Sequence, residues 1–228
     1  LGAMAGASAS TDRMTLNLRS LTRPELLDAA VSLAARQLAY PSFPSAVWQT
    51  ERQRWIAGIR ESSTKPNVQA SRAYAKAVYG DHPYGDETDE ASLNKIDTGM
   101  MKAFHARHFV PCRAKVSIVG AINREQATQR VEQLLKGLPA SQNCDLLPIV
   151  PEVQPLATAQ NIAIPFESAQ AHVFIGQPGI ARQNPDFFAL TVGNYVLGGG
   201  GFVSRLTDQV REKRHEKQIP AEVVFLRH

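Results

Sequence analysis

The stretch Leu197-Gly-Gly-Gly-Gly-Phe-Val-Ser-Arg-Leu206 places four consecutive glycines near the C-terminal end of the sequence. Asn184-Pro185 opens the helix expected before the glycines, and Val203, Leu206 and Val210 have the spacing of a helix after them. Because glycine lets backbones approach closely, we expect either a packed helix-to-helix turn or a loop that touches a peptide. The stretch is not a dinucleotide fingerprint, because Val203 replaces its third glycine, and no stretch of the sequence matches a Walker phosphate loop.

The residues upstream of this helix pair predict strands and then a linker. Ile162, Ile164 and Phe166 alternate with other residues, and an apolar strand is expected over 171–176. Prolines recur from Pro139 to Pro155 without a helical period, which predicts an extended linker. We therefore expect three parts: 1–139, a Pro-rich linker at 140–157, and 158–228. The last part is short for a closed domain, so we expect it to be incomplete.

The first part has the pattern of mixed helices and strands. Two capping boxes are expected, Thr22 with Glu25 and Asn123 with Gln126, each opening a helix. In the helix expected at 45–62, Trp48, Trp55 and Ile59 are predicted to face inward. The other expected elements are strands at 14–18 and 114–120, helices at 24–38 and 68–78, a turn at 80–85, and a helix ending near Phe109.

Composition excludes several classes of protein. The 228 residues are 43% hydrophobic and 20% charged, which is typical of a globular chain and not of a disordered one. The net charge of +4 is scattered, unlike the basic stripe of a nucleic-acid binder, and no apolar run is long enough to span a membrane. The segment Leu1–Ser10 lacks the features of a signal peptide, and we expect a chain that has already been cut. Cys112 and Cys144 are expected to have no special role.

The sequence offers no catalytic residue and no metal ligand from its motifs. A G-x-S-x-G elbow is absent, and Ser204 is predicted to be an ordinary helix residue. His105 and His108 could share a helix face, but they lack a third ligand, so a solvated helix end is expected. His215-Glu216 fails the H-E-x-x-H pattern because Ile219 replaces the second histidine.

Taken together, several motifs resemble those of the insulinase-type (pitrilysin-like) zinc metallopeptidases of the bacterial two-domain processing-protease kind. The motifs are Tyr40-Pro-Ser-Phe-Pro44, His82-Pro-Tyr-Gly85, Phe104 to Pro111 leading into Val116-Ser-Ile-Val-Gly120, the glycine stretch, and Val210-Arg-Glu-Lys-Arg214. The resemblance implies an α+β fold of metallopeptidase-like modules, each a mostly antiparallel sheet with helices packed on one face. It makes 1–139 the later part of one module and 158–228 the first part of the next, which is incomplete.

The resemblance also indicates that this chain holds no zinc itself. The family binds zinc through H-x-x-E-H, which is absent here, and through a Glu seven residues after another helical Glu. Aligning Glu51 with the first Glu puts Gly58, which has no donor atom, at the ligand position, and Glu61 lies nearly a turn further along the helix. We therefore expect zinc only in a catalytic partner or in a missing segment.

Some family pairs contain a member without zinc that contributes an Arg and a Tyr to substrate binding. Arg211 matches that Arg, whereas Gln218 occupies the expected Tyr position. The resemblance thus implies a substrate-binding role for Arg211. The close backbone approach that glycine permits makes Gly199 and Gly200 of the glycine stretch candidates for contact with substrate.

The function expected from the resemblance is that of a non-catalytic homologue. It would pair with a zinc-bearing peptidase subunit, or form a homodimer, and would bind and position peptides without hydrolysing them. One alternative is a fragment of an active zinc metalloendopeptidase whose H-x-x-E-H helix lies upstream, and another is a structural assembly subunit. By analogy with the family, we expect a periplasmic or exported location.

Overall fold

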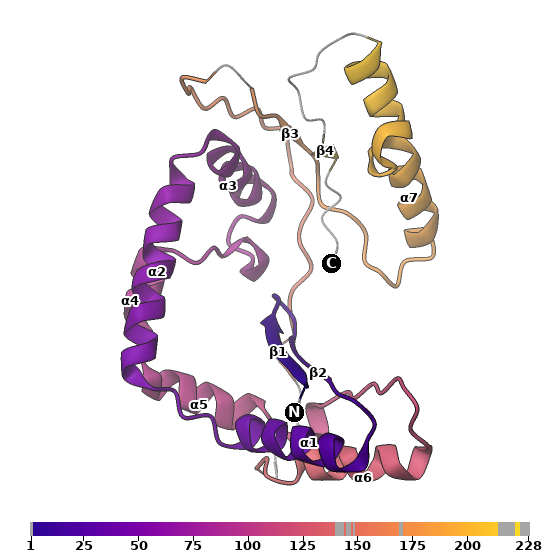
Figure 1. The fold of residues 1–228 in the computed structure, drawn as a ribbon. Helices are drawn as coiled ribbons and strands as arrows, with labels where there is room; N and C mark the ends of the chain where they lie inside the picture. The colour runs from indigo at the N-terminus through magenta and orange to yellow at the C-terminus, as the bar shows by residue number, and fades with distance from the viewer. Residues whose placement is uncertain are drawn as a thin grey trace. The chain divides into compact units, whose positions relative to one another are not determined.

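The computed structural model describes residues 2–139, 144, 147, 149–168, 171–213 and 222–223 (Figure 1). These residues form a mixed, mostly helical α/β structure with small sheets. Two compact units can be distinguished: unit 1 comprises Leu1–Arg54 and Ala91–Pro148, and unit 2 comprises Trp55–Glu90 and Ile149–His228. The expected division at 140–157 stays a prediction. Among the described helices, none combines the length and apolar character needed to cross a membrane.

Unit 1 joins a β-hairpin to helices. Strands β1 (Met4–Ala9) and β2 (Met14–Arg19) pair antiparallel, with Met4 opposite Arg19 and Ala9 opposite Met14, which confirms the strand expected at 14–18. The helical elements are α1 (Pro24–Ala39), the first part of α2 (Ser45–Ser63), α4 (Glu90–Lys95), α5 (Thr98–His108), η2 (Pro111–Arg113) and α6 (Arg124–Leu135). The short helix α4 was not expected from the sequence.

The start of α1 corrects one of the two expected capping boxes. The N-cap residue is Arg23, in an extended conformation, and no side chain caps the helix. Pro24 explains the difference, because a proline disfavours helical geometry in the residue before it and is well suited to the first helical position. Thr22 therefore lies one residue too early to cap the helix with Glu25.

The second capping box is confirmed at the start of α6. The Gln126 backbone N–H donates to the Asn123 side-chain oxygen at 2.9 Å, and the Asn123 N–H donates to the Gln126 side chain at 3.1 Å. Both bonds satisfy backbone donors that the first turn of a helix leaves without partners.

We expect Asn123→Ala to lower the free energy of unfolding by about 1 kcal/mol, because the helix loses this N-cap. Thr22→Ala is the matched control and should leave stability unchanged, since α1 has no side-chain cap to lose. Urea unfolding followed by circular dichroism measures both. Equal losses in the two variants would contradict the assignment of the cap.

The buried side chains of unit 1 come mainly from its helices. The His105 ring on α5 donates from Nε2 to the Leu38 carbonyl oxygen at 2.8 Å, which satisfies an acceptor in the last turn of α1. Trp48 Nε1 donates to the Ile96 carbonyl oxygen at 3.0 Å. The buried apolar residues of unit 1 are Ala30, Val31, Leu38, Leu93, Val110 and Leu138.

The strand expected at 114–120 does not form. Residues 114–119 are assigned neither helix nor strand, and Val116, Ile118 and Val119 are exposed. A strand needs a neighbour to receive its backbone hydrogen bonds, and the described part of unit 1 provides none at this segment. The alternation of apolar residues was read correctly, but it did not reveal whether a neighbouring strand was available.

Cys112 and Cys144 form a disulfide, so the expectation that they have no special role was wrong. Their Cα atoms lie 5.9 Å apart although the residues are separated by 32 positions in sequence. The bond links η2, just after α5, to the beginning of the Pro-rich stretch. Spacing alone could not reveal it, because two distant cysteines pair only when the fold brings them together.

Unit 2 combines helices with a two-residue parallel strand pair. Phe174 and Ile175 of β3 (Phe174–Ile175) pair with Glu222 and Val223 of β4 (Glu222–Val223). Only this part of the strand expected at 171–176 forms, and the strand expected around 162–166 is absent. The helical elements are the rest of α2, α3 (Pro66–Tyr79), η1 (Pro83–Gly85), α7 (Phe187–Asn194), η3 (Tyr195–Gly199), η4 (Gly201–Val203) and η5 (Thr207–Glu212).

The core of unit 2 includes the buried residues Ile56, Val78 and Phe187. In α2, Ile56 is buried in place of the expected Trp55, which is exposed. The sequence pattern therefore placed the inward-facing residue of α2 one position too early at this point. The Tyr74 ring on α3 lies 5.9 Å from the Phe174 ring on β3, measured between ring centroids.

The expected turn at 80–85 forms around η1 and holds the Pro-rich stretch. His82 Nδ1 accepts the Tyr84 backbone N–H at 3.1 Å, and Nε2 lies 2.7 Å from the Pro151 carbonyl oxygen. Because a carbonyl oxygen can only accept, Nε2 is the donor in this hydrogen bond. This histidine of the His82-Pro-Tyr-Gly85 motif therefore fixes residue 151 within unit 2.

Candidate functional site

The candidate site is the glycine turn, defined as residues 198–201, with the helical segments on either side. In Figure 1, α7 and the segments up to η5 follow one another along one side of unit 2. The Asn184 side chain accepts the Asp186 N–H at 2.9 Å just before α7, which agrees with the helix start expected at Asn184-Pro185. Beyond Asn194 the helix widens into the π-helical η3. The glycines therefore lie between two helical segments, as expected.

Two of the glycines are required by the geometry of the turn. A Cβ atom on Gly200 would lie 2.9 Å from the Tyr195 carbonyl oxygen and 3.4 Å from an atom of the Tyr195 ring. Gly201 has φ +64°, a backbone conformation that side chains disfavour. These positions explain the packed helix-to-helix turn, the first of the two roles expected for the glycines.

Ser204 is an N-cap rather than the ordinary helix residue that the sequence suggested. It is 2% exposed, and its hydroxyl oxygen accepts the Thr207 N–H at 3.3 Å. The Ser204 hydroxyl donates to Thr207 Oγ1 at 2.9 Å, and the Thr207 hydroxyl donates to the Gly201 carbonyl oxygen at 3.1 Å. This chain of bonds ties the next helical segment to the glycine turn. A Ser three residues before a Thr at a helix start was the signal that could have revealed it.

Of the three residues expected to bind substrate, two lie in the glycine turn. Gly199 ends η3, and Gly200 connects it to η4. Arg211 lies in η5, but its side chain falls outside the described residues, as does Gln218. Nearby, Lys213 Nζ donates to Asp208 at 2.8 Å, and this hydrogen bond is the main cause that lowers the pKa of the Asp208 carboxyl. The substrate-binding roles of the three residues stay predictions.

We expect Gly200→Ala to lower the free energy of unfolding by about 1–3 kcal/mol, because the added methyl group collides with the Tyr195 carbonyl. Gly193→Ala is the matched control in α7, where a Cβ atom would meet nothing within 4 Å. It should be neutral or stabilise by up to about 1 kcal/mol, since alanine favours helices. Urea unfolding of both variants measures these changes in stability. A loss of stability in Gly193→Ala but not in Gly200→Ala would contradict the packing of Gly200 against Tyr195.

The histidines that the sequence analysis considered as metal ligands have structural contacts instead. His105 is bonded to the Leu38 carbonyl, so it is not simply a solvated residue at a helix end. The His108 ring lies against the Phe104 ring in a tilted arrangement, with ring centroids 4.5 Å apart, and His108 Nδ1 lies 3.3 Å from Arg113 Nη1. Burial, followed by the positive charges of Arg107 and Arg113, lowers the pKa of His108. His215 lies outside the described residues.

The residues present do not fit the zinc site of the family. Glu51 pairs with Arg54 at 3.0 Å, Glu61 pairs with Lys65 at 3.1 Å, and Gly58 has no donor atom. Within the described part of the chain, no three His, Cys, Asp or Glu side chains are grouped so that they could hold a metal ion.

Known structures place this fold among peptidase modules. The crystal structure of a peptidase M16 inactive domain from Pseudomonas fluorescens matches with a TM-score of 0.79 and 29% identity, over 93% of this chain and 51% of that one. A protease from Helicobacter pylori has the same fold, with a TM-score of 0.73 and 18% identity, over 93% of this chain and 52% of that one.

Residues 95–226 match the family described as the peptidase M16 inactive domain, and the chain belongs to that family. This confirms the resemblance found in the sequence.

An uncharacterized zinc protease of Streptomyces coelicolor is 27% identical over 169 residues, which are 72% of this chain and 37% of that protein. One of Mycobacterium tuberculosis is 23% identical over 168 residues, which are 73% of this chain and 38% of that protein. The chain thus spans well under half the length of these curated relatives.

Proposed function

We propose that this chain is a non-catalytic peptidase-family module that pairs with a homologous zinc-bearing subunit and helps to bind and position peptides. The observation that carries the proposal is membership of the M16 inactive-domain family, in a sequence that lacks H-x-x-E-H. In this role the chain needs no zinc of its own, and zinc belongs to the partner.

The glycine turn supports the peptide-binding part of the proposal. Glycines leave their backbone N–H and C=O groups accessible to an extended peptide, and Gly199 and Gly200 would offer these groups. Arg211 would add a charged donor to a peptide carbonyl or carboxylate. The bonds from Ser204 and Thr207 hold the turn in one conformation, so a peptide would meet a preorganised surface.

We also propose that the two peptidase-like parts each complete a mostly antiparallel sheet with helices on one face. The alternating apolar residues at 114–119 and 162–166 support this, because they have the period of strands but no strand pairing among the described residues. Additional strands from outside this sequence would cover their apolar side chains.

A periplasmic or exported location is proposed on the basis of the Cys112–Cys144 disulfide. Disulfides persist in oxidising compartments and are rare in the bacterial cytosol. Trapping free thiols with a maleimide reagent in cells that express the full-length protein tests this location. Two reactive thiols in the native protein would contradict it.

Binding of fluorescein-labelled β-casein, an unfolded protein, tests the peptide-binding role. We expect the purified chain to raise the anisotropy of the casein without cleaving it, with or without added zinc. Arg211→Ala should weaken binding about tenfold, as expected for a lost charge-assisted hydrogen bond. Arg36→Ala, on the exposed side of α1 in unit 1, is the matched control and should bind normally. Absence of binding would overturn the proposal.

A second candidate is a part of an active zinc metalloendopeptidase, favoured by the zinc-protease names of the curated relatives. Elemental analysis of the full-length protein that contains this chain, after dialysis against zinc, separates the two candidates, because the second places H-x-x-E-H upstream of this sequence. One tightly held zinc per molecule together with cleavage of casein would establish the second candidate, whereas casein binding without zinc supports the first.

A further inference from the structure

Three aromatic side chains gather where α3 ends and η1 begins. The Tyr79 and His82 rings stack with their centroids 6.0 Å apart, and the Tyr84 ring lies edge-on to both, 6.3 Å from the Tyr79 ring and 5.0 Å from the His82 ring. We call these three residues the aromatic cluster. Each is half-buried. Rings that combine an apolar body with a polar tip in this way are typical of surfaces that bind peptides.

The backbone of the turn holds the aromatic cluster in place. The His82 N–H donates to the Tyr79 carbonyl oxygen at 2.9 Å, and the Gly85 N–H donates to the His82 carbonyl oxygen at 2.8 Å. A Cβ atom on Gly85 would lie 2.7 Å from the Tyr79 Cβ, so the turn packs closely on the end of α3. The aromatic cluster is therefore preorganised and does not have to be assembled when a ligand binds.

His82 gives the aromatic cluster a hydrogen-bond donor with a fixed direction. Its Nδ1 accepts the Tyr84 backbone N–H at 3.1 Å, which orients the ring, and its Nε2 donates to the Pro151 carbonyl oxygen at 2.7 Å. Proline-rich segments bind in aromatic-lined grooves, and a polyproline II backbone makes no hydrogen bonds of its own. A donor beside aromatic rings is therefore suited to the carbonyl groups of such a segment.

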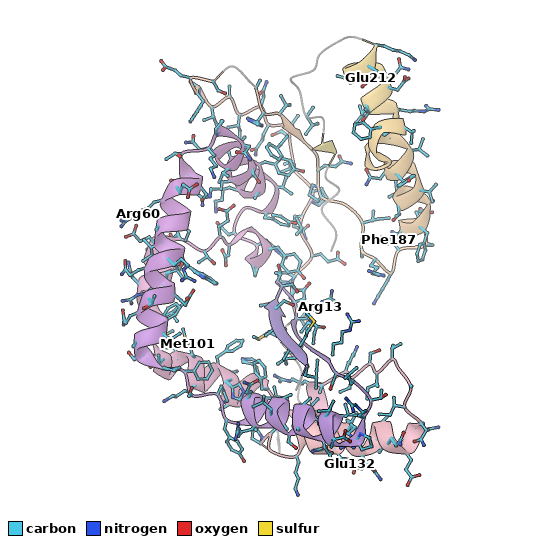
Figure 2. All side chains as sticks on the ribbon, viewed as in Figure 1. Arg13, Arg60, Met101, Glu132, Phe187 and Glu212 are labelled. Carbon is cyan, nitrogen blue, oxygen red and sulfur yellow. A yellow bond between two sulfur atoms is a disulfide. The ribbon has the colours of Figure 1, made fainter. Side chains whose placement is uncertain are left out.

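The residues that reach the aromatic cluster have the chemistry of such a ligand. Residues 149–155, which we call the proline segment, form neither helix nor strand and contain Pro151 and Pro155. Pro148 and Pro151 also make a P-x-x-P sequence. Proline fixes φ near −65° and favours polyproline II, so the segment loses little entropy when it is held. Figure 2 shows side chains filling the space between α3 and the extended stretch that leads into β3.

We propose that the aromatic cluster is a binding site for an extended, proline-containing peptide, and that the proline segment occupies this site and keeps such a peptide of another molecule out. Both the aromatic cluster and the proline segment belong to unit 2. Because they are parts of one chain, the proline segment acts at an effective concentration on the order of 1 mM, against which a separate peptide must compete. This site is distinct from the glycine turn and does not depend on its proposed role.

Fluorescence anisotropy of a labelled peptide with the sequence of residues 146–157 tests the binding site. The unaltered chain is compared with a variant in which Gly and Ser replace residues 149–155. For a peptide with a Kd of about 30 µM, removal of a competitor at about 1 mM should tighten binding about 30-fold. In the Gly-Ser variant, His82→Phe keeps a ring but removes the donor and should weaken binding about fivefold. His172→Phe, at a half-buried histidine of unit 2 outside the aromatic cluster, is the matched control and should bind normally.

Cleavage of the unaltered chain by a glutamate-specific protease tests whether the proline segment occupies the site. Glu152 follows Pro151 and is exposed. Because the segment must leave the aromatic cluster before the protease can cut, His82→Phe should speed cleavage after Glu152 about fivefold, whereas His172→Phe should leave the rate unchanged. Circular dichroism establishes that each variant is folded, and this measurement does not require the Gly-Ser variant to fold.

Three results would overturn the proposal. Absence of peptide binding by a folded Gly-Ser variant would show that the aromatic cluster is not a binding site. Equal binding by the Gly-Ser variant and the unaltered chain would show that the proline segment does not compete for it. An unchanged rate of cleavage after Glu152 in His82→Phe would show that His82 does not hold the proline segment.

Discussion

Reduction of the Cys112–Cys144 disulfide is expected to lower the free energy of unfolding by about 3.5 kcal/mol, from the loop-closure entropy of a crosslink that spans 32 residues. The bond restricts the unfolded chain, so its loss favours the unfolded state even where the folded contacts persist. It also joins Cys144 to Cys112 in η2. Urea unfolding with and without a phosphine reductant measures the effect.

The double variant Cys112→Ser/Cys144→Ser is the control for this prediction. Its urea midpoint should match that of the reduced chain and should not respond to the reductant. A midpoint that shifts equally in the chain and in the double variant would show that the reductant acts elsewhere. If reduction leaves the midpoint of the unaltered chain unchanged, the crosslink does not contribute to stability.

Leu93→Ala is expected to cost about 3 kcal/mol of unfolding free energy. Leu93 is 1% exposed and is among the most completely buried side chains of the described chain. Its truncation removes buried apolar atoms and leaves a cavity that the surrounding side chains fill only in part. It lies in α4, a helix of six residues that has little stability of its own and depends on this burial.

Leu21→Ala is the matched control, because Leu21 is exposed between β2 and α1. Its unfolding free energy should change by less than about 0.5 kcal/mol. Equal effects of the two substitutions would contradict the burial of Leu93. Helix α4 can also be followed by hydrogen exchange, where the Leu93→Ala variant should exchange faster over 90–95 than the control.

Gly200 connects the fold to the proposed peptide-binding role, because its packing on Tyr195 fixes the glycine turn that would present backbone groups to a peptide. The Gly200→Ala variant should therefore weaken casein binding as well as stability, whereas Arg211→Ala should affect casein binding alone.

Local sequence features were read reliably. The capping box of Asn123 and Gln126 and the glycines between two helical segments were predicted from the sequence and are confirmed. Most of the order of the helices was also predicted from the sequence. Each of these features depends on residues that lie only a few positions apart in the sequence. Their spacing and backbone preferences favour the local structure without the help of distant contacts. The Thr22–Glu25 box failed because a single neighbour, Pro24, changed the local preference.

The amino-acid sequence by itself determined the family, the helices and the absence of H-x-x-E-H. Only the tertiary structure decided that Cys112 pairs with Cys144, that His105 binds the Leu38 carbonyl 67 residues away, and that 114–119 remains unpaired. The reason is physical: a helix closes its hydrogen bonds within its own segment, whereas strands, disulfides and long-range hydrogen bonds need a second group whose arrival depends on the whole fold.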